Sequence, residues 1–150
     1  MLTEETSTVV GQNDSEWAAF IKTLEAAEEK FACGQPEHFK ALWSHTDDVT
    51  LIGGLGGIIE RGWEKVAARL DWASSNYVDG TRSRQEVSGF VESGFAYLVQ
   101  KEVIEACIGG RTERSTQELR VTMMFRREND GWRIIHRHAD SQTNAWPPRG

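Results

Sequence analysis

The sequence lacks any apolar run close to the roughly 20 residues that a helix needs to cross a bilayer, so a soluble protein is expected. It has only two cysteines, Cys33 and Cys107, and their spacing fits no metal or redox motif. Because two cysteines in a chain of this length do not build a disulfide framework, reduced thiols are the better interpretation. The acidic opening, with Glu4 and Glu5, lacks the basic start of a secretory signal. A cytoplasmic location is therefore predicted.

The sequence also lacks an excess of positive charge. It has 17 Lys and Arg against 23 Asp and Glu, a formal net charge of −6. A surface of that sign repels nucleic-acid phosphates unless a local basic patch overrides it. The basic residues that cluster near 126–127 and 133–137 have no aromatic stacking platform beside them. Neither a nucleic acid nor a membrane is expected as a partner.

Motifs for common catalytic devices are missing as well. There is no Gly-x-Ser-x-Gly elbow, and neither cysteine has a neighbouring histidine, so nucleophilic catalysis has no local support. The glycine-rich run at 53–57 shares its glycines with phosphate-binding loops, but a short strand follows it instead of a helix, and no Lys-Ser or Lys-Thr closes it. A hairpin turn is the better interpretation.

The sequence does contain helix and strand patterns for one domain. A length of 150 residues is typical of a single domain. We predict a folded unit over residues 14–141, a flexible arm at 1–13 and a tail at 142–150.

Apolar residues at helical spacing predict three helices. The first spans about residues 14–34, the second is short and begins at Pro36, and the third spans about 63–75. The inward stripe predicted for the first helix consists of Trp17, Phe20, Ile21, Leu24 and Phe31. Glu28 is predicted to lie off this stripe.

Runs of β-branched and aromatic residues predict the strands. A hairpin pairs 49–52 with 58–59 through the glycine-rich turn, and longer strands follow at 82–92, 95–107, 114–127 and 132–140. Turn-forming pairs such as Ser93-Gly94 and Asp130-Gly131 separate these strands, which favours an antiparallel meander. The predicted fold class is α+β, with helices covering one face of a curved antiparallel sheet.

The last predicted strand, 132–140, contains the strongest candidate for a binding residue. Regular alternation groups Trp132 and Ile134 with the two histidines of the strand and puts Arg137 on the opposite face. We predict that Arg137 points inward, where a guanidinium needs a carboxylate partner or an anionic ligand, and that Glu102 is its partner. The alternative is a half-exposed Arg137, or a permanent ion pair without a ligand role.

The two histidines, His136 and His138, are predicted to lie on the outer face of the sheet. They share a face at strand spacing but lack a third ligand of clear geometry, so hydrogen-bonded or interface histidines are favoured over a metal site. Inward aromatic residues either line an apolar cavity or form plain core. The aromatic candidates are Trp43, Trp63, Trp72, Tyr97 and Phe125.

Two segments stand out beside the order of these elements, Glu60-Arg61-Gly62-Trp63 and Gly131-Trp132-Arg133-Ile134-Ile135-His136-Arg137-His138. Together with that order, they resemble the nuclear transport factor 2-like superfamily, and within it the SnoaL-like branch that includes the calcium/calmodulin-dependent kinase II association domain. The resemblance covers roughly residues 15–141. It implies a cone-shaped, strongly bent antiparallel sheet wrapped around a long helix, as in cystatin-like folds, with a deep pocket and a homodimer formed through the outer sheet face.

The resemblance does not imply one activity, since the superfamily includes isomerases, cyclases, dehydratases, epoxide hydrolases, ligand binders and assembly modules. The ketosteroid isomerase pattern places a general-base Asp on the first hairpin, where this sequence has Gly53 or a close neighbour without a carboxylate. The association-domain pattern places cations in the cavity, and the corresponding residues are Met123, Arg137 and Ala139. Only Arg137 keeps that role.

Three functional hypotheses follow. The first is a homodimeric protein that binds a small molecule with an apolar body and a polar or anionic end near Arg137, without a cofactor. The second is an isomerase, hydrolase or dehydratase-type enzyme that uses Glu102, Asp71 or a histidine of the last strand as acid or base. The third is an assembly domain whose cavity has no ligand.

Overall fold

The computed structural model describes residues 14–145, and its central feature is a mixed six-stranded sheet with the strand order β2-β1-β6-β5-β4-β3. The helices are α1 (Asp14–Phe31), α2 (Glu37–Ala41) and α3 (Trp63–Ser74). The strands are β1 (Thr50–Ile52), β2 (Glu60–Arg61), β3 (Tyr77–Val91), β4 (Phe95–Ile108), β5 (Arg114–Glu128) and β6 (Gly131–Asp140). The predicted α+β class with a curved sheet is confirmed. The arm predicted at 1–13 and the end of the tail, 146–150, lie outside the described residues.

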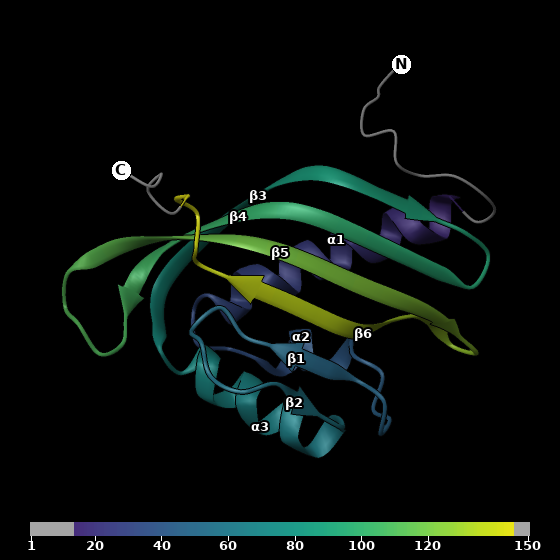
Figure 1. The fold of residues 1–150 in the computed structure, drawn as a ribbon, viewed down its shortest axis with the longest axis horizontal. Coiled ribbons are helices and arrows are strands. Elements are labelled where there is room, and N and C mark those ends of the chain that lie inside the picture. The colour runs from purple at the N-terminus through teal and green to yellow at the C-terminus, as the bar shows by residue number, and fades with distance from the viewer. Residues whose placement is uncertain (1–13, 146–150) are drawn as a thin grey trace, which may run out of the picture.

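The long strands bend together and cover α1, while α3 lies beside β1 and β2 (Figure 1). Neighbouring strands from β3 to β6 are antiparallel, as predicted. The pair β1 and β6 is parallel, with Thr50 opposite His136, so the sheet is not antiparallel throughout. A parallel pair needs a long crossover connection, and α3 with the meander of β3, β4 and β5 supplies it between β1 and β6.

Helix α1 buries one face against the sheet, and Glu28 belongs to that face. Trp17 and Leu24 are buried, and Glu28 is only 4% exposed. The prediction that Glu28 lies off the apolar stripe is wrong, because it follows Leu24 by four residues and Trp17 by three helical turns. The helix ends where Gly34 adopts φ +83° and donates its N–H to the carbonyl of Phe31.

The first hairpin is shorter and its loop wider than predicted. Leu51 of β1 pairs with Glu60 of β2. Ile58 and Ile59, predicted as the second strand, lie in the loop and are 75% and 63% exposed. The sequence signal failed here because β-branched residues favour strands in general, whereas pairing fixes which residues face Leu51.

Strand β3 begins at Tyr77, ahead of the predicted start at 82. Its first part contains an irregularity between Val78 and Thr81, and Asp79 there has φ 55°. A side chain at Gly80 would place its Cβ 2.1 Å from the carbonyl oxygen of Ala32, so only glycine fits where β3 crosses the end of α1. The start of β3 therefore contains turn-forming residues, Asp79 and Gly80, and for this reason the sequence pattern predicts a later start.

The core fills the space between α1 and the inner face of the sheet. Trp17 packs edge-on against Phe125 and Trp132, each with ring centroids 5.0 Å apart. Within residues 14–145, none of the helices combines the length and apolar character needed to span a membrane.

Candidate functional site

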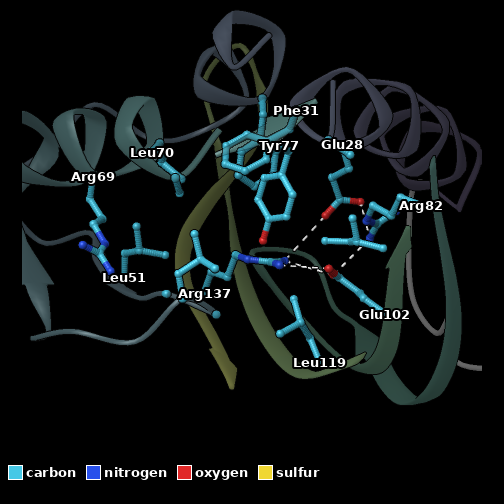
Figure 2. Close-up of a pocket in the computed structure, with 17 residues that line it drawn as sticks. Glu28, Phe31, Leu51, Arg69, Leu70, Tyr77, Arg82, Glu102, Leu119 and Arg137 are labelled. Atoms are coloured by element: carbon cyan, nitrogen blue, oxygen red, sulfur yellow. Dashed lines mark hydrogen bonds and ion pairs between the residues drawn. The ribbon is translucent and has the colours of Figure 1, made fainter. Parts of the chain in front are cut away.

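A cavity of about 50 Å³ lies inside the curve of the sheet, with walls from α1, α2, α3 and strands β1, β3, β4, β5 and β6 (Figure 2). Most of its wall is apolar, with side chains such as Phe31, Leu51 and Leu119. Its volume holds a few water molecules. One end is different, because two carboxylates and two guanidinium groups meet there.

A bulge in β6 brings Arg137 to this cavity. Phe125 of β5 pairs with Ile134 and Met124 pairs with His136, so Ile135 is an extra residue in β6. The bulge shifts the alternation, and the buried Trp132 and Ile134 share the inner face with Arg137. The predicted grouping of Trp132 and Ile134 with the histidines is therefore wrong, while the predicted separation of the histidines from Arg137 holds.

Arg137 forms a two-pronged ion pair with Glu102, as predicted. Its Nη1 lies 3.0 Å from Oε2 and its Nη2 lies 2.9 Å from Oε1 of Glu102. Glu102 is 1% exposed, and Gln100 also donates to it at 2.7 Å. Both carboxylate oxygens thus receive charge-assisted or neutral hydrogen bonds, which holds Glu102 in its ionised form.

The sequence did not reveal the other two members of the cluster, Glu28 and Arg82. Arg82 Nη2 lies 2.7 Å from Glu28 Oε1 and 3.0 Å from Glu102 Oε2. Glu28 Oε2 lies 3.7 Å from Arg137 Nη1. Although both Glu28 oxygens are buried beside cations, neither accepts a hydrogen bond of normal geometry. We call Glu28, Arg82, Glu102 and Arg137 the charge cluster.

A signal for Glu28 existed, since its spacing from Trp17 and Leu24 places it on the buried face of a helix. No comparable signal existed for Arg82. Its inward direction depends on the irregularity at the start of β3, which the sequence pattern does not reveal.

The two carboxylates of the cluster titrate differently. Burial raises the pKa of Glu28 from 4.5 to about 7, because Arg82 and Arg137 offset only part of the desolvation and Glu102 adds to it. Burial also acts to raise the pKa of Glu102, but Arg137 and Arg82 outweigh it and hold that pKa well below its usual range. The pKa of Arg137 is raised, because Glu102 and Glu28 outweigh its desolvation. Within the charge cluster, Glu28 is therefore the member that changes charge near neutral pH.

The other end of the cavity is closed by the glycine-rich loop of the first hairpin and by α3. Gly53, Gly54 and Leu55 line it together with Arg69. The Arg69 guanidinium donates to the carbonyl of Gly56 and lies over the ring of Trp72, 4.1 Å from its centroid. Arg69 lies away from the charge cluster (Figure 2).

The sequence profile of the SnoaL-like domain matches residues 21–142, which include every member of the charge cluster. The chain belongs to the SnoaL-like domain family. The comparison with curated proteins found no match.

Solved structures share the fold of this SnoaL-like domain. A nuclear transport factor 2-like superfamily protein from Salmonella enterica serovar Typhimurium superposes with a TM-score of 0.74 and 18% identity over 91% of this chain and 95% of that one. A candidate dehydratase of the nuclear transport factor 2-like family from Streptomyces avermitilis superposes with a TM-score of 0.71 and 20% identity, over 87% of this chain and 96% of that one. A candidate calcium/calmodulin-dependent protein kinase type II association domain from Thiobacillus denitrificans superposes with a TM-score of 0.68 and 23% identity, over 84% of this chain and 94% of that one.

Most residues predicted to line the cavity of this SnoaL-like domain lie elsewhere. The predicted lining role is wrong for Trp43, Trp63, Tyr97 and Phe125, none of which borders the cavity. Trp43 and Phe125 are buried core, Trp63 stacks on His45 with centroids 4.0 Å apart, and Tyr97 packs edge-on against Phe90. The aromatic residues that do border the cavity are Phe31, Phe39 and Tyr77.

Met123 lies behind the cavity wall. It is fully buried and its Sδ is 3.5 Å from Arg137 Nη1. The corresponding prediction that Met123 lines the cavity is therefore wrong, although Met123 supports the side chain of Arg137.

The acid and base candidates other than Glu102 lie outside the cavity. Asp71 is exposed on α3 and pairs with Lys40 at 2.8 Å. His136 shares a hydrogen bond with Thr50 through Nδ1 at 2.7 Å, and His138 lies 3.7 Å from Asp140. Burial and the neighbouring charge of His138 lower the pKa of His136. An acid–base role for these three residues in the cavity is excluded by their positions.

Proposed function

We propose that this SnoaL-like domain binds a small molecule with an apolar body and an anionic or polar end. The observation that carries this proposal is the buried charge cluster at one end of an otherwise apolar cavity. Buried ionic groups are expensive to desolvate and contribute little to stability compared with apolar packing, so a binding role accounts better for their presence. The anionic end would lie beside Arg137 and the apolar body against Leu51 and Leu119.

The cavity limits the size of this ligand. Its volume of about 50 Å³ is far below the roughly 300–1,000 Å³ of pockets that enclose drug-sized ligands. A ligand of a few heavy atoms fits without rearrangement, and a larger one requires the glycine-rich loop at 53–57 to move. Small monocarboxylates, from acetate to hexanoate and benzoate, are therefore suitable probes.

Calorimetric titration of these probes tests the proposal. At least one probe should bind, and Arg137→Ala should abolish the binding. Arg133→Ala is the matched control, because Arg133 is on the same strand but pairs with Asp130 at 2.7 Å outside the cavity. Equal probe affinity in Arg137→Ala and the unmodified protein would refute the proposed role of Arg137.

A second candidate function is acid–base catalysis in the same cavity, as in an isomerase or dehydratase. The observation that favours it is Glu28, whose pKa of about 7 lies near the operating pH of most general acids and bases. The fold is shared with the candidate dehydratase from Streptomyces avermitilis. Exchange of the α-hydrogens of a small neutral ketone such as butanone with D₂O, followed by NMR, tests this function, because a neutral ligand leaves Glu28 free to act as the base. Glu28→Gln should abolish the exchange while probe binding persists.

We also propose a homodimer formed through the outer face of the sheet, in the cytoplasm. Phe95 and Met124 are exposed large apolar residues on the adjacent strands β4 and β5 of that face. Sedimentation velocity should give the mass of a dimer, and Met124→Glu should give a monomer. A dimer without any probe binding would favour the assembly function.

Cell fractionation tests the proposed cytoplasmic location.

A further inference from the structure

The charge cluster has no spare positive charge. Arg82 and Arg137 carry two positive charges, and ionised Glu28 and Glu102 carry two negative ones. Arg137 is bound by both oxygens of Glu102, and Arg82 lies between Glu28 and Glu102. An anion that entered this buried site with all four groups ionised would leave one uncompensated negative charge, which is strongly unfavourable at low dielectric.

Glu28 is the group that is able to give up its charge. Glu102 is held by Arg137, Arg82 and Gln100, whereas neither oxygen of Glu28 accepts a hydrogen bond of normal geometry. Its distance from Arg137, 3.7 Å, is also the longest contact within the cluster. Glu28 thus has one close ionic contact, with Arg82 at 2.7 Å, whereas Glu102 has close contacts with both arginines and with Gln100.

The groups that act on Glu28 come from three strands. They are Arg82 and Arg84 of β3, Glu102 of β4 and Arg137 of β6. Tyr77 of β3 and Arg69 of α3 face the same cavity without a direct ion pair to Glu28. Arg84 is engaged by Glu25 of α1 at 2.7 Å and by Gln100. The pKa of Glu102 is lowered, mainly by Arg137 and Arg82, and the pKa values of Arg82 and Arg137 are raised by the two carboxylates, so these three members of the charge cluster keep their charges.

We infer that this cavity binds a small monoanion together with one proton, which Glu28 takes up from solvent. The inference rests on the proposed function, since it concerns the same anionic ligand. The anion brings one negative charge and the proton neutralises one, so the net charge of the cluster stays at zero. Protonated Glu28 also gains a hydrogen-bond donor, which the ionised carboxylate lacks.

The same count of charges limits the charge of the ligand to one negative charge. A monocarboxylate needs one proton and the cluster has one titrating carboxylate. A dianion such as succinate or hydrogen phosphate would need a second proton, which Glu102 does not accept because its two arginine partners keep it ionised. We therefore expect monocarboxylates to bind and dianions of similar size to bind at least tenfold more weakly.

The experiment is calorimetric titration of butanoate into the protein at pH 8, in HEPES and in Tris, two buffers with different ionisation enthalpies. The difference between the observed enthalpies gives the number of protons taken up. With the pKa of Glu28 at about 7, roughly one proton per anion is expected at pH 8 and roughly half a proton at pH 7. The affinity should fall about tenfold between pH 6 and pH 8, in line with proton linkage.

Three variants test whether Glu28 takes up the proton. Glu28→Gln should bind butanoate without proton uptake and with an affinity independent of pH. Glu29→Gln is the matched control, because Glu29 is the next residue of α1 and is exposed, and it should keep the proton uptake. His138→Gln should also keep it, since His138 is on the outer face.

The outcomes separate this inference from the proposed function. If no monocarboxylate binds at any pH, the proposed function fails and this inference fails with it. If butanoate binds and needs Arg137 but no proton is taken up at pH 8, only the inference fails. The buffer comparison uses the unmodified protein, so it decides the matter even if Glu28→Gln does not fold.

Discussion

Replacing Glu28 with glutamine should change how the stability of this domain depends on pH. The pKa of Glu28 is 4.5 before burial and about 7 in the folded protein. Because one pKa unit corresponds to about 1.4 kcal/mol, ionised Glu28 lowers the free energy of unfolding by about 3 kcal/mol. A group with a raised pKa leaves stability intact below pH 4.5 and reduces it progressively as the pH rises to about 7.

The size of the effect depends on the pH window. Between pH 5 and pH 8 the unmodified protein should lose about 2–3 kcal/mol of stability through Glu28. Glutamine has the same shape and no charge, so Glu28→Gln should not lose this amount. Relative to the unmodified protein, the variant should become more stable by that amount as the pH rises, or by about 4–12 °C in Tm for a domain of this size.

Urea unfolding monitored by tryptophan fluorescence at pH 5, 6, 7 and 8 measures this difference, since the chain has six tryptophans. Comparing the two proteins at each pH removes the titration of groups they share. Glu29→Gln should follow the unmodified protein throughout. Two results would refute the reasoning: a difference that stays constant with pH, or one that shrinks as the pH rises, which would mean that the cluster lowers the pKa of Glu28.

Further substitutions test other parts of the structure in the same urea assay. Arg137→Met should cost about 3–5 kcal/mol because Glu102 loses its two-pronged partner, and Arg137→Met with Glu102→Met should recover part of it. Phe125→Ala should cost about 3–5 kcal/mol by creating a cavity in the core, while probe affinity stays unchanged. Gly80→Ala should cost about 1–3 kcal/mol because its Cβ would meet a backbone carbonyl at 2.1 Å, and Gly94→Ala should stay within about 0.5 kcal/mol because nothing lies within 4 Å.

Each of these has an outcome that would contradict it. A double methionine variant as unstable as Arg137→Met alone would mean that the buried carboxylate is not the source of the loss. If folded Phe125→Ala bound the probe more weakly, Phe125 would have to be counted among the residues that contribute to ligand binding. Equal stability of the two glycine variants would show that β3 moves away from α1 without difficulty.

The order of helices and strands could be predicted from the sequence because it depends on local patterns. The third helix and strands β4, β5 and β6 agree closely with the predicted ranges. Two errors have a shared cause. Ile58 and Ile59 have strand-forming side chains but no partner strand, and the start of β3 has turn-forming residues but does have a partner. In both segments, pairing with a distant part of the chain determines whether a strand forms. A local sequence pattern carries no information about that pairing.

The site was harder to predict than the fold. Arg137 and Glu102 were paired correctly, because a charge on an inward strand face requires an opposite charge nearby. Glu28 is predicted to lie off the apolar stripe, although its spacing from Leu24 puts it on the buried face of α1, where it meets a buried partner. That partner, Arg82, points inward only through an irregular start of β3. Aromatic residues were assigned to the cavity by type, whereas packing placed Trp43 and Phe125 in the core.

The bulge at Ile135 has a consequence for insertions and deletions in β6. Ile134 and Arg137 both face inward although two residues separate them. In a regular strand, residues that face the same way are separated by an odd number of residues. Ile135 is therefore an extra residue that the ladder does not pair. A one-residue deletion at Ile135 would yield a regular strand with the same inner side chains. We therefore expect β6 to tolerate a one-residue deletion at Ile135 with its inner side chains unchanged, and the altered surface would be the outer one, which carries the histidines.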